Sequence, residues 1–551
     1  MTLGGRPAAA DRPARAAVRV NRGLRQLRRM IAALLICVTL LQLPVAAQAP
    51  PARRLRGSEA LGAVYDTILD GRSADQIDIE LGKACPPAPA EACQVLRVTG
   101  AWWRIQRDPH TRAGDAAFMH DVDAAIAATE AWTGRAPRDG EAWFYLGAAY
   151  ALRVQFRVLR SEKLAAARDG KRIKQALERA VALDPRLNDA YFGIGLYQYY
   201  ADVAPAAAKI LRWLLLLPGG DKKEGLRQML RTQALGEVLR GEADFQLHIL
   251  YLWYENRPDR AVELLERLRA RHPTNAYFAI LIAEIQDIYF HDPTAALAAY
   301  ASVLASAREH RVSDPRMAET QARIGMARQL EALVETDRAI EQLKATLELR
   351  PEAPYSARAL AAFRLGEAYD RMGDRDLASA AYRSALAAAP ADDPLGIVNQ
   401  ANRALGRRPD ARVADAYRLS MEGWRALQRN ELGTAAAALT RSLQLRGNDP
   451  VSHYRAGRLA QARGDEADAL RSYDRAIRLR AACPPTILAA AYLDAGRLHE
   501  RAGRRDRAAA MYRGASGVFG ASAETRTLAQ RLLARLSAAT ASPRAARAAR
   551  R

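Results

Sequence analysis

Residues 366–385 read GEAYDRMGDRDLASAAYRSA, and this stretch decides the fold of the 551-residue chain. Small residues stand at Gly366 and Ala378, where they let two helix backbones approach closely. The ring of Tyr382 fills the space that remains between the helices. Gly373 divides the stretch, because glycine readily ends a helix and turns the chain. The pattern therefore predicts two antiparallel helices of about a dozen residues each.

The same pattern returns further along the chain. Close copies begin at Gly457 and Gly496, and a looser copy begins at Gly423. Gly423 and Gly457 lie 34 residues apart, whereas Gly457 and Gly496 lie 39 residues apart because Cys483-Pro-Pro lengthens the connector. Recurrence at a fixed period is the sign of a repeat array, in which each unit packs on its neighbours. About nine units span residues 136–515, and the most regular ones lie towards the C-terminal end.

These units resemble the tetratricopeptide repeat, which has a period of about 34 residues and the pattern W-x2-L-G-x2-Y, followed by A-x3-F and a later proline. Residues 143–150, which read WFYLGAAY, match the first helix of that pattern. The resemblance implies an all-α, superhelical solenoid of antiparallel helix pairs, in which the first helix of each pair lines the concave side. Composition agrees, because Ala, Leu and Arg favour helices and alternating β-branched runs are nearly absent.

The chain divides into five segments. We expect a signal peptide over residues 1–47, an N-terminal helical region over 48–135, irregular tetratricopeptide-like repeats with an insertion over 136–310, a regular array with a C-terminal capping helix over 315–536, and a disordered basic tail over 537–551. The apolar run at 210–217 is too short to span a membrane. It is expected to be a buried helix, with contact to a membrane surface or to a partner as the alternative.

The first fifty residues carry the features of a secretory signal. A basic stretch that ends at Arg29 is followed by an apolar run over residues 31–43, then by Pro44 and small residues at 45–47. These features predict export with cleavage after Ala47, as in exported bacterial proteins of this repeat type, to the periplasm or cell envelope of a Gram-negative-type bacterium. An uncleaved anchor is the alternative, because the run approaches the length that spans a membrane. It would give the N-terminal segment a membrane contact.

Cysteine is sparse in this chain. Cys37 lies inside the expected signal, and Cys85 and Cys93 flank a short Pro-rich loop that a disulfide could close, as suits an exported protein. A metal site is the alternative, but the spacing lacks the tight ligand pairs of zinc sites. Cys483 is left as an odd thiol, either buried or free.

The formal charge of +22 invites comparison with nucleic-acid-binding proteins. Most of the excess lies at the two ends, with eleven arginines against one acid in residues 1–56 and four arginines in residues 544–551. The repeats between them carry only a weak excess, and no nucleic-acid-binding motif accompanies it. We therefore expect no nucleic-acid partner.

Motifs for catalysis and for cofactor binding are absent from the sequence. It holds no G-x-x-x-x-G-K-[ST], H-E-x-x-H, G-x-S-x-G or paired C-x-x-C motif. His120, Asp121 and Asp123 come nearest to a metal cluster, yet they stand in polar helical surroundings where a solvated face explains them. We expect no catalytic residue, no cofactor and no metal, and a protein that is not an enzyme.

Partner binding is expected in the concave groove. With each aligned glycine at position 8 of its unit, the resemblance places six side chains of the C-terminal array there: Tyr417, Trp424, Tyr454, Arg458, Arg497 and Arg501. Aromatic residues and arginine dominate binding hot spots, although each of these side chains could instead solvate the inner face or pack locally.

Together these features predict a non-catalytic scaffold or adaptor of the cell envelope that binds a peptide or a partner helix in the groove. The alternative is a membrane-anchored structural component of an envelope or secretion assembly. The partner's identity and the oligomeric state stay open.

Overall fold

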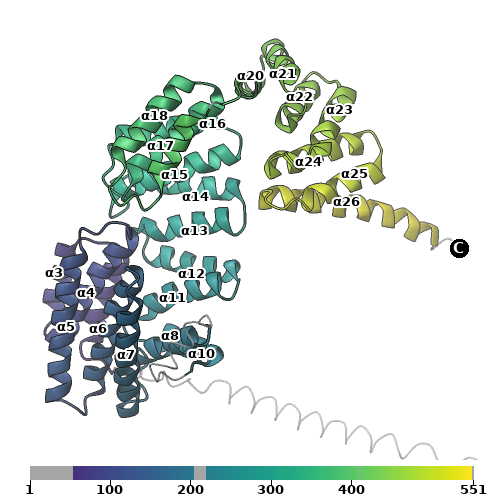
Figure 1. Ribbon diagram of the computed structural model, residues 1–551. Coiled ribbons are helices and arrows are strands. Elements are labelled where there is room, and N and C mark those ends of the chain that lie inside the picture. The colour runs from purple at the N-terminus through teal and green to yellow at the C-terminus, as the bar shows by residue number, and fades with distance from the viewer. Residues whose placement is uncertain (1–53, 204–218, 408, 549–551) are drawn as a thin grey trace, which may run out of the picture. The chain divides into compact units, whose positions relative to one another are not determined.

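The computed structural model describes residues 54–203, 219–407 and 409–548, with side chains up to Ala538 (Figure 1). Within these ranges every regular element is a helix and no strand occurs, which confirms the all-α prediction. The described residues belong to one compact unit, Arg54–Arg551. The expected signal or anchor at 1–47 and the apolar run at 210–217 lie outside the described residues.

Long helices build the N-terminal region and pack in sequence. They are α2 (Ser58–Leu69), α3 (Ala74–Ala84), α4 (Ala90–Arg107), α5 (Asp115–Arg135), α6 (Gly140–Leu159) and α7 (Lys163–Leu183). The insertion expected after residues 143–150 lengthens the helices rather than forming a loop, since α6 and α7 have 20 and 21 residues. Asp169 on α7 accepts from Arg153 Nε at 2.8 Å and also pairs with Arg157, so ion pairs hold the added turns together.

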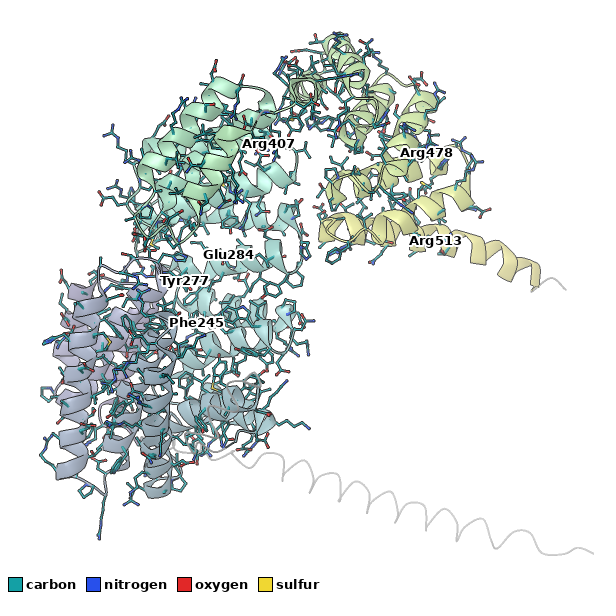
Figure 2. All side chains as sticks on the ribbon, viewed as in Figure 1. Phe245, Tyr277, Glu284, Arg407, Arg478 and Arg513 are labelled. Atoms are coloured by element: carbon teal, nitrogen blue, oxygen red, sulfur yellow. A yellow bond between two sulfur atoms is a disulfide. The ribbon has the colours of Figure 1, made fainter. Side chains whose placement is uncertain are left out.

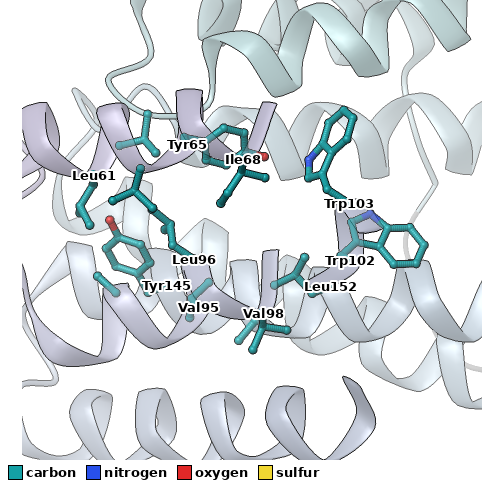
Figure 3. Packing of buried hydrophobic residues seen from close by; sticks show 14 of the residues in the cluster. Leu61, Tyr65, Ile68, Val95, Leu96, Val98, Trp102, Trp103, Tyr145 and Leu152 are labelled. Carbon is teal, nitrogen blue, oxygen red and sulfur yellow. The ribbon is translucent and has the colours of Figure 1, made fainter. Parts of the chain in front are cut away.

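A buried core joins these helices to α11 (Arg240–Trp253). Figure 3 shows Tyr65 and Trp103 among the apolar side chains of this core. The ring centroids of Trp103 and Phe245 lie 4.6 Å apart. The buried Glu242 carboxylate accepts hydrogen bonds from Tyr65 Oη at 2.7 Å and Trp103 Nε1 at 3.2 Å, and burial raises its pKa. One acid on α11 thus binds both α2 and α4, and these hydrogen bonds hold the irregular N-terminal helices together.

Antiparallel pairs continue through the middle of the chain. The helices are α8 (Ala190–Val203), α10 (Lys222–Leu235), α11, α12 (Pro258–Arg271), α13 (Ala276–Ile288), α14 (Pro293–Arg308), α15 (Pro315–Ala332) and α16 (Thr336–Glu348). Aspartates cap several of them, such as Asp292, whose Oδ1 accepts from Ala295 N at 3.0 Å. Each of these helices packs on its neighbour in sequence, as the repeat pattern predicts.

The C-terminal array is more regular but contains one helix that the sequence pattern did not predict. Its helices are α17 (Ala357–Met372), α18 (Arg375–Ala388), α19 (Ile397–Gly406), α20 (Ala411–Gln428), α21 (Leu432–Leu445), α22 (Pro450–Ala462), α23 (Glu466–Arg478), α24 (Pro485–Arg501), α25 (Arg505–Ser516) and α26 (Ala523–Ala548). The unpredicted helix is α19, which follows the pair α17 and α18 and packs on both helices. The expected capping helix is α26, and it continues past Leu536 to Ala548 because Ala and Arg favour helix.

Close approach of a glycine to a tyrosine holds the two helices of a regular pair together. A Cβ atom added at Gly457 on α22 would lie 2.5 Å from Cε1 of Tyr473 on α23, and the same distance separates such an atom at Gly366 from Tyr382. Tyr473 is buried, and its Oη donates to Gln461 Oε1 at 2.8 Å. The glycine and the aromatic that the sequence singled out are therefore in direct contact.

Replacement of Gly457 by alanine should destabilise the array. The added methyl group would overlap the Tyr473 ring, which its hydrogen bond holds in place, and overpacking of this kind costs about 1–3 kcal/mol. A urea titration followed by circular dichroism should show a lower midpoint. The matched control is Gly433→Ala on α21, where an added Cβ would meet nothing within 4 Å beyond its own stretch of helix, so the midpoint should stay or rise. Equal midpoints for the two variants would contradict the packing argument.

Candidate functional site on the first-helix face

The first helices of successive pairs contact one another. Such contacts join α13 to α15, α15 to α17, α17 to α20, α20 to α22 and α22 to α24. We call the surface made by these helices the first-helix face. It is the side on which the repeat pattern predicts partner binding, and all six residues that the sequence singled out belong to its helices.

Three of those six side chains lie around one acid, and a fourth lies beside them. Tyr454 Oη donates to Asp494 Oδ2 at 3.3 Å, and Arg458 Nη1 lies 3.2 Å from Tyr454 Oη and 3.6 Å from the same carboxylate oxygen. Arg497 Nη1 lies 3.5 Å from Asp494 Oδ1. The Trp424 ring lies next to Tyr454, with 6.4 Å between centroids. We call these five residues the Asp494 cluster.

The charges of the Asp494 cluster do not cancel. Burial raises the pKa of Asp494, although Arg458 and Arg497 act to lower it. The Asp494 side chain is 9% exposed, whereas those of Arg458 and Arg497 are 42% and 45% exposed. Two guanidinium groups thus share one carboxylate, and their outer N–H groups face solvent. Such groups can donate to carbonyl or carboxylate oxygens of a bound segment.

The other two predicted side chains lie elsewhere. Arg501 Nε donates to Glu466 Oε1 on α23 at 3.0 Å, and its side chain is exposed. Tyr417 Oη lies 2.7 Å from Thr336 Oγ1 at the start of α16. The hydroxyl group of Tyr417 therefore serves a contact within the chain, between α20 and a helix that lies two pairs earlier.

Sequence reasoning missed two residues of this region. Asp494 is an acid inside an apolar stretch of α24, and that local contrast was the available signal. Arg455 is buried on α22, where Nη1 donates to Ser420 Oγ and Nη2 to Val334 O, both at 2.9 Å, and its guanidinium lies 5.7 Å from the Trp424 ring centroid. Burial lowers its pKa to about 10. Its partner at Val334 is distant in sequence, so no local pattern reveals it.

A cavity opens on the same face, closer to the N-terminal end. It has a volume of about 380 Å³ and lies between α13, α15 and α17. Its walls are apolar at Ile280, Ile324 and Leu360, aromatic at Tyr300 and Tyr355, and charged at Glu284, Arg328, Glu331, Arg364, Glu367 and Arg371. We call it the middle cavity. Figure 2 shows Glu284 in the middle of α13.

The structure also shows the surroundings of the cysteines. The sulfur atoms of Cys85 and Cys93 lie at bonding distance, and their Cα atoms are 6.5 Å apart. Cys483 is buried, and burial raises the pKa of its thiol to about 12.

Among the described side chains no group of His, Cys, Asp and Glu is arranged to hold a metal ion. No helix in the described ranges is long and apolar enough to cross a membrane.

Comparison with known proteins gives one family match. The model of the tetratricopeptide repeat matches residues 359–392, which include most of α17 and all of α18. The comparison with curated protein sequences gave no match.

Several solved structures are similar to this chain at low identity. One is a tetratricopeptide repeat protein from Parabacteroides merdae, with 17% identity, a TM-score of 0.24, and coverage of 54% of this chain and 98% of that one. A second is a Rap protein complexed with competence and sporulation factor, with 13% identity, a TM-score of 0.32, and coverage of 77% and 97%. A third is the tetratricopeptide domain of P58(IPK), with 16% identity, a TM-score of 0.20, and coverage of 70% and 99%.

The family match at α17 and α18 and the recurring antiparallel pairs, with glycine packed against tyrosine, agree with the pattern read from the sequence. Residues 359–392 therefore form a tetratricopeptide repeat within an all-helical array of helix pairs.

Proposed function

We propose that this protein is a non-catalytic interaction scaffold of the cell envelope that binds a peptide or a partner helix on its first-helix face. Tetratricopeptide arrays stack into extended surfaces that bind other proteins. The Asp494 cluster carries the proposal, because it gathers two half-exposed guanidinium groups and two aromatic rings from three consecutive first helices. Arginine and aromatic side chains are the residue types that contribute most to protein interfaces.

The chemistry of the Asp494 cluster favours a partner segment with exposed acceptor oxygens. Arg458 and Arg497 have donors that Asp494 does not use, and Trp424 offers an apolar ring beside them. A carboxylate side chain, a chain terminus or the carbonyl groups at the end of a helix would each fit these donors. Charge-assisted hydrogen bonds of this kind contribute about 1.5–3 kcal/mol each.

Binding should weaken when both exposed guanidinium groups are removed. The variant Arg458→Ala/Arg497→Ala, used as bait in envelope extracts after crosslinking in the native cell, should recover at least about tenfold less of the partner than the wild type. The control is Arg471→Ala/Arg475→Ala, which removes the same charge from exposed positions on the second helix α23. Thermal denaturation of both variants verifies folding. Equal recovery by wild type and by the Arg458/Arg497 variant would reject this surface.

Export is the second part of the proposal, and it rests on the signal-like residues 1–47. Protein purified from the native cell and sequenced from its N-terminus should begin at Gln48. A chain that still contains residues 31–43 would instead support the membrane-anchored alternative.

Oxidation of the Cys85–Cys93 pair should accompany export. Alkylation without reduction, followed by mass spectrometry, should leave both residues unmodified in protein from the native cell. Protein made without residues 1–47 in a reducing cytoplasm is the control, and both thiols should be alkylated there. Free thiols at both positions in the native protein would contradict the prediction.

A further inference from the structure

The middle cavity presents one carboxylate that has no partner. Glu284 lies on α13, between Ile280 and Asp287 in the sequence. Its side chain lines the cavity. Within the described part of the chain, no hydrogen bond and no ion pair within 4 Å reaches its carboxylate group; Arg328 acts on it only at longer range. The side chain is half-buried, and burial raises its pKa. A carboxylate in this position lacks the donors that a buried acid normally has.

The arginines that line the same cavity are already paired. Arg328 Nη2 lies 2.6 Å from Asp287 Oδ2, and Arg364 Nη1 lies 2.7 Å from Glu367 Oε2. Arg371 pairs with Glu331. The cations and their acids therefore balance, and Glu284 is the charge left over.

A second atom of the cavity wall also lacks a donor. Glu331 Oε2 accepts from Thr336 Oγ1 at 3.1 Å and from Arg371, but Glu331 Oε1 is buried and no hydrogen bond from a described residue reaches it. The two unsatisfied acceptors belong to neighbouring first helices, α13 and α15, which contact each other. Because Glu331 Oε1 is buried, it is the Glu284 carboxylate that points to an occupant with hydrogen-bond donors and one positive charge.

We propose that the middle cavity takes one lysine or arginine side chain of the bound partner segment, with Glu284 as its counter-ion. The cavity, at about 380 Å³, has room for far more than single waters, each of which occupies about 30 Å³ in the liquid. Its apolar walls at Ile280, Ile324 and Leu360 suit the aliphatic stem of such a side chain, and the charged head reaches the carboxylate.

This inference rests on the proposed function, since it assumes that a segment lies along the first-helix face. It adds to that function a preference for the sign of the charge that the partner carries at each site. At the Asp494 cluster the protein offers donors for an acceptor group, whereas at the middle cavity it offers an acceptor for a cation. A bound segment would thus carry an acidic or carbonyl group at one end and a basic side chain at the other.

Peptide binding by the purified chain tests the inference. The probes are four pools of short fluorescein-labelled peptides with Lys, Arg, Gln or Glu fixed at the centre and other positions drawn from Ala, Leu and Ser. Fluorescence anisotropy should show at least tenfold tighter binding of the Lys or Arg pool than of the Gln pool. Glu284→Gln should abolish that difference, and Glu284→Lys should shift the preference to the Glu pool. The control Glu341→Gln, at an exposed position on the second helix α16, should leave it unchanged.

A stability measurement separates a binding role from a structural one. Because no hydrogen bond or ion pair within the described residues reaches Glu284, Glu284→Gln should keep or raise the melting temperature, as happens when an unpaired, half-buried charge is removed. A lowered melting temperature would mean that Glu284 supports the fold, which would overturn the inference.

Failure of the inference and failure of the proposed function differ in outcome. Peptides that bind without a preference for Lys or Arg, and that lose affinity in the Arg458→Ala/Arg497→Ala variant, would overturn the inference and keep the function. Spermidine is a polycation that would compete for the Glu284 carboxylate. If it displaced bound peptide equally from the wild type and from Glu284→Gln, the inference would likewise be overturned. Absence of binding for all four pools would count against both.

Discussion

Contact between a glycine on one helix and a tyrosine on the next sets the distance within each regular pair, and the rest of the structure depends on it. At Gly457 a single methyl group would meet the Tyr473 ring at 2.5 Å, so the two backbones approach as closely as the ring allows. The hydroxyl group of the same ring is bound to Gln461. Where leucine replaces tyrosine, as with Leu439 beside Gly423, the same closeness is kept. This fixed spacing places successive first helices side by side.

Electrostatics then distinguishes positions along the first-helix face. Arg455, which lacks a carboxylate partner within hydrogen-bonding distance among the described residues, is buried and joins α22 to Val334. Arg425 pairs with Asp337 at 2.6 Å and joins α20 to α16. These contacts use part of the face to hold the chain together. The Asp494 cluster and the middle cavity are the parts of the face where we propose that a partner binds.

Much of this could be predicted from the sequence. The helix pairs follow from a local pattern of small residues, aromatics and prolines, and repeat geometry brings Tyr454, Arg458 and Arg497 to neighbouring first helices, where the structure has them around one acid. The helix α19 could not be predicted, because the glycine and prolines near it are typical of a connector. In the structure, Asp393 stabilises its first turn by accepting a hydrogen bond from Ile397 N at 2.8 Å. The contact of Tyr417 with Thr336 depends on how pairs stack over more than eighty residues. Glu284 was not identified from the sequence, because it lies in a repeat unit that departs from the regular pattern.

Site-specific photocrosslinking in the native cell tests the central claim most directly. A photoreactive phenylalanine analogue would replace Trp424 on the first-helix face, and in a separate strain Leu377, which is exposed on the second helix α18. A discrete protein adduct is expected at position 424 and none at position 377. An adduct at 377 without one at 424, or equal adducts at both, would contradict that claim.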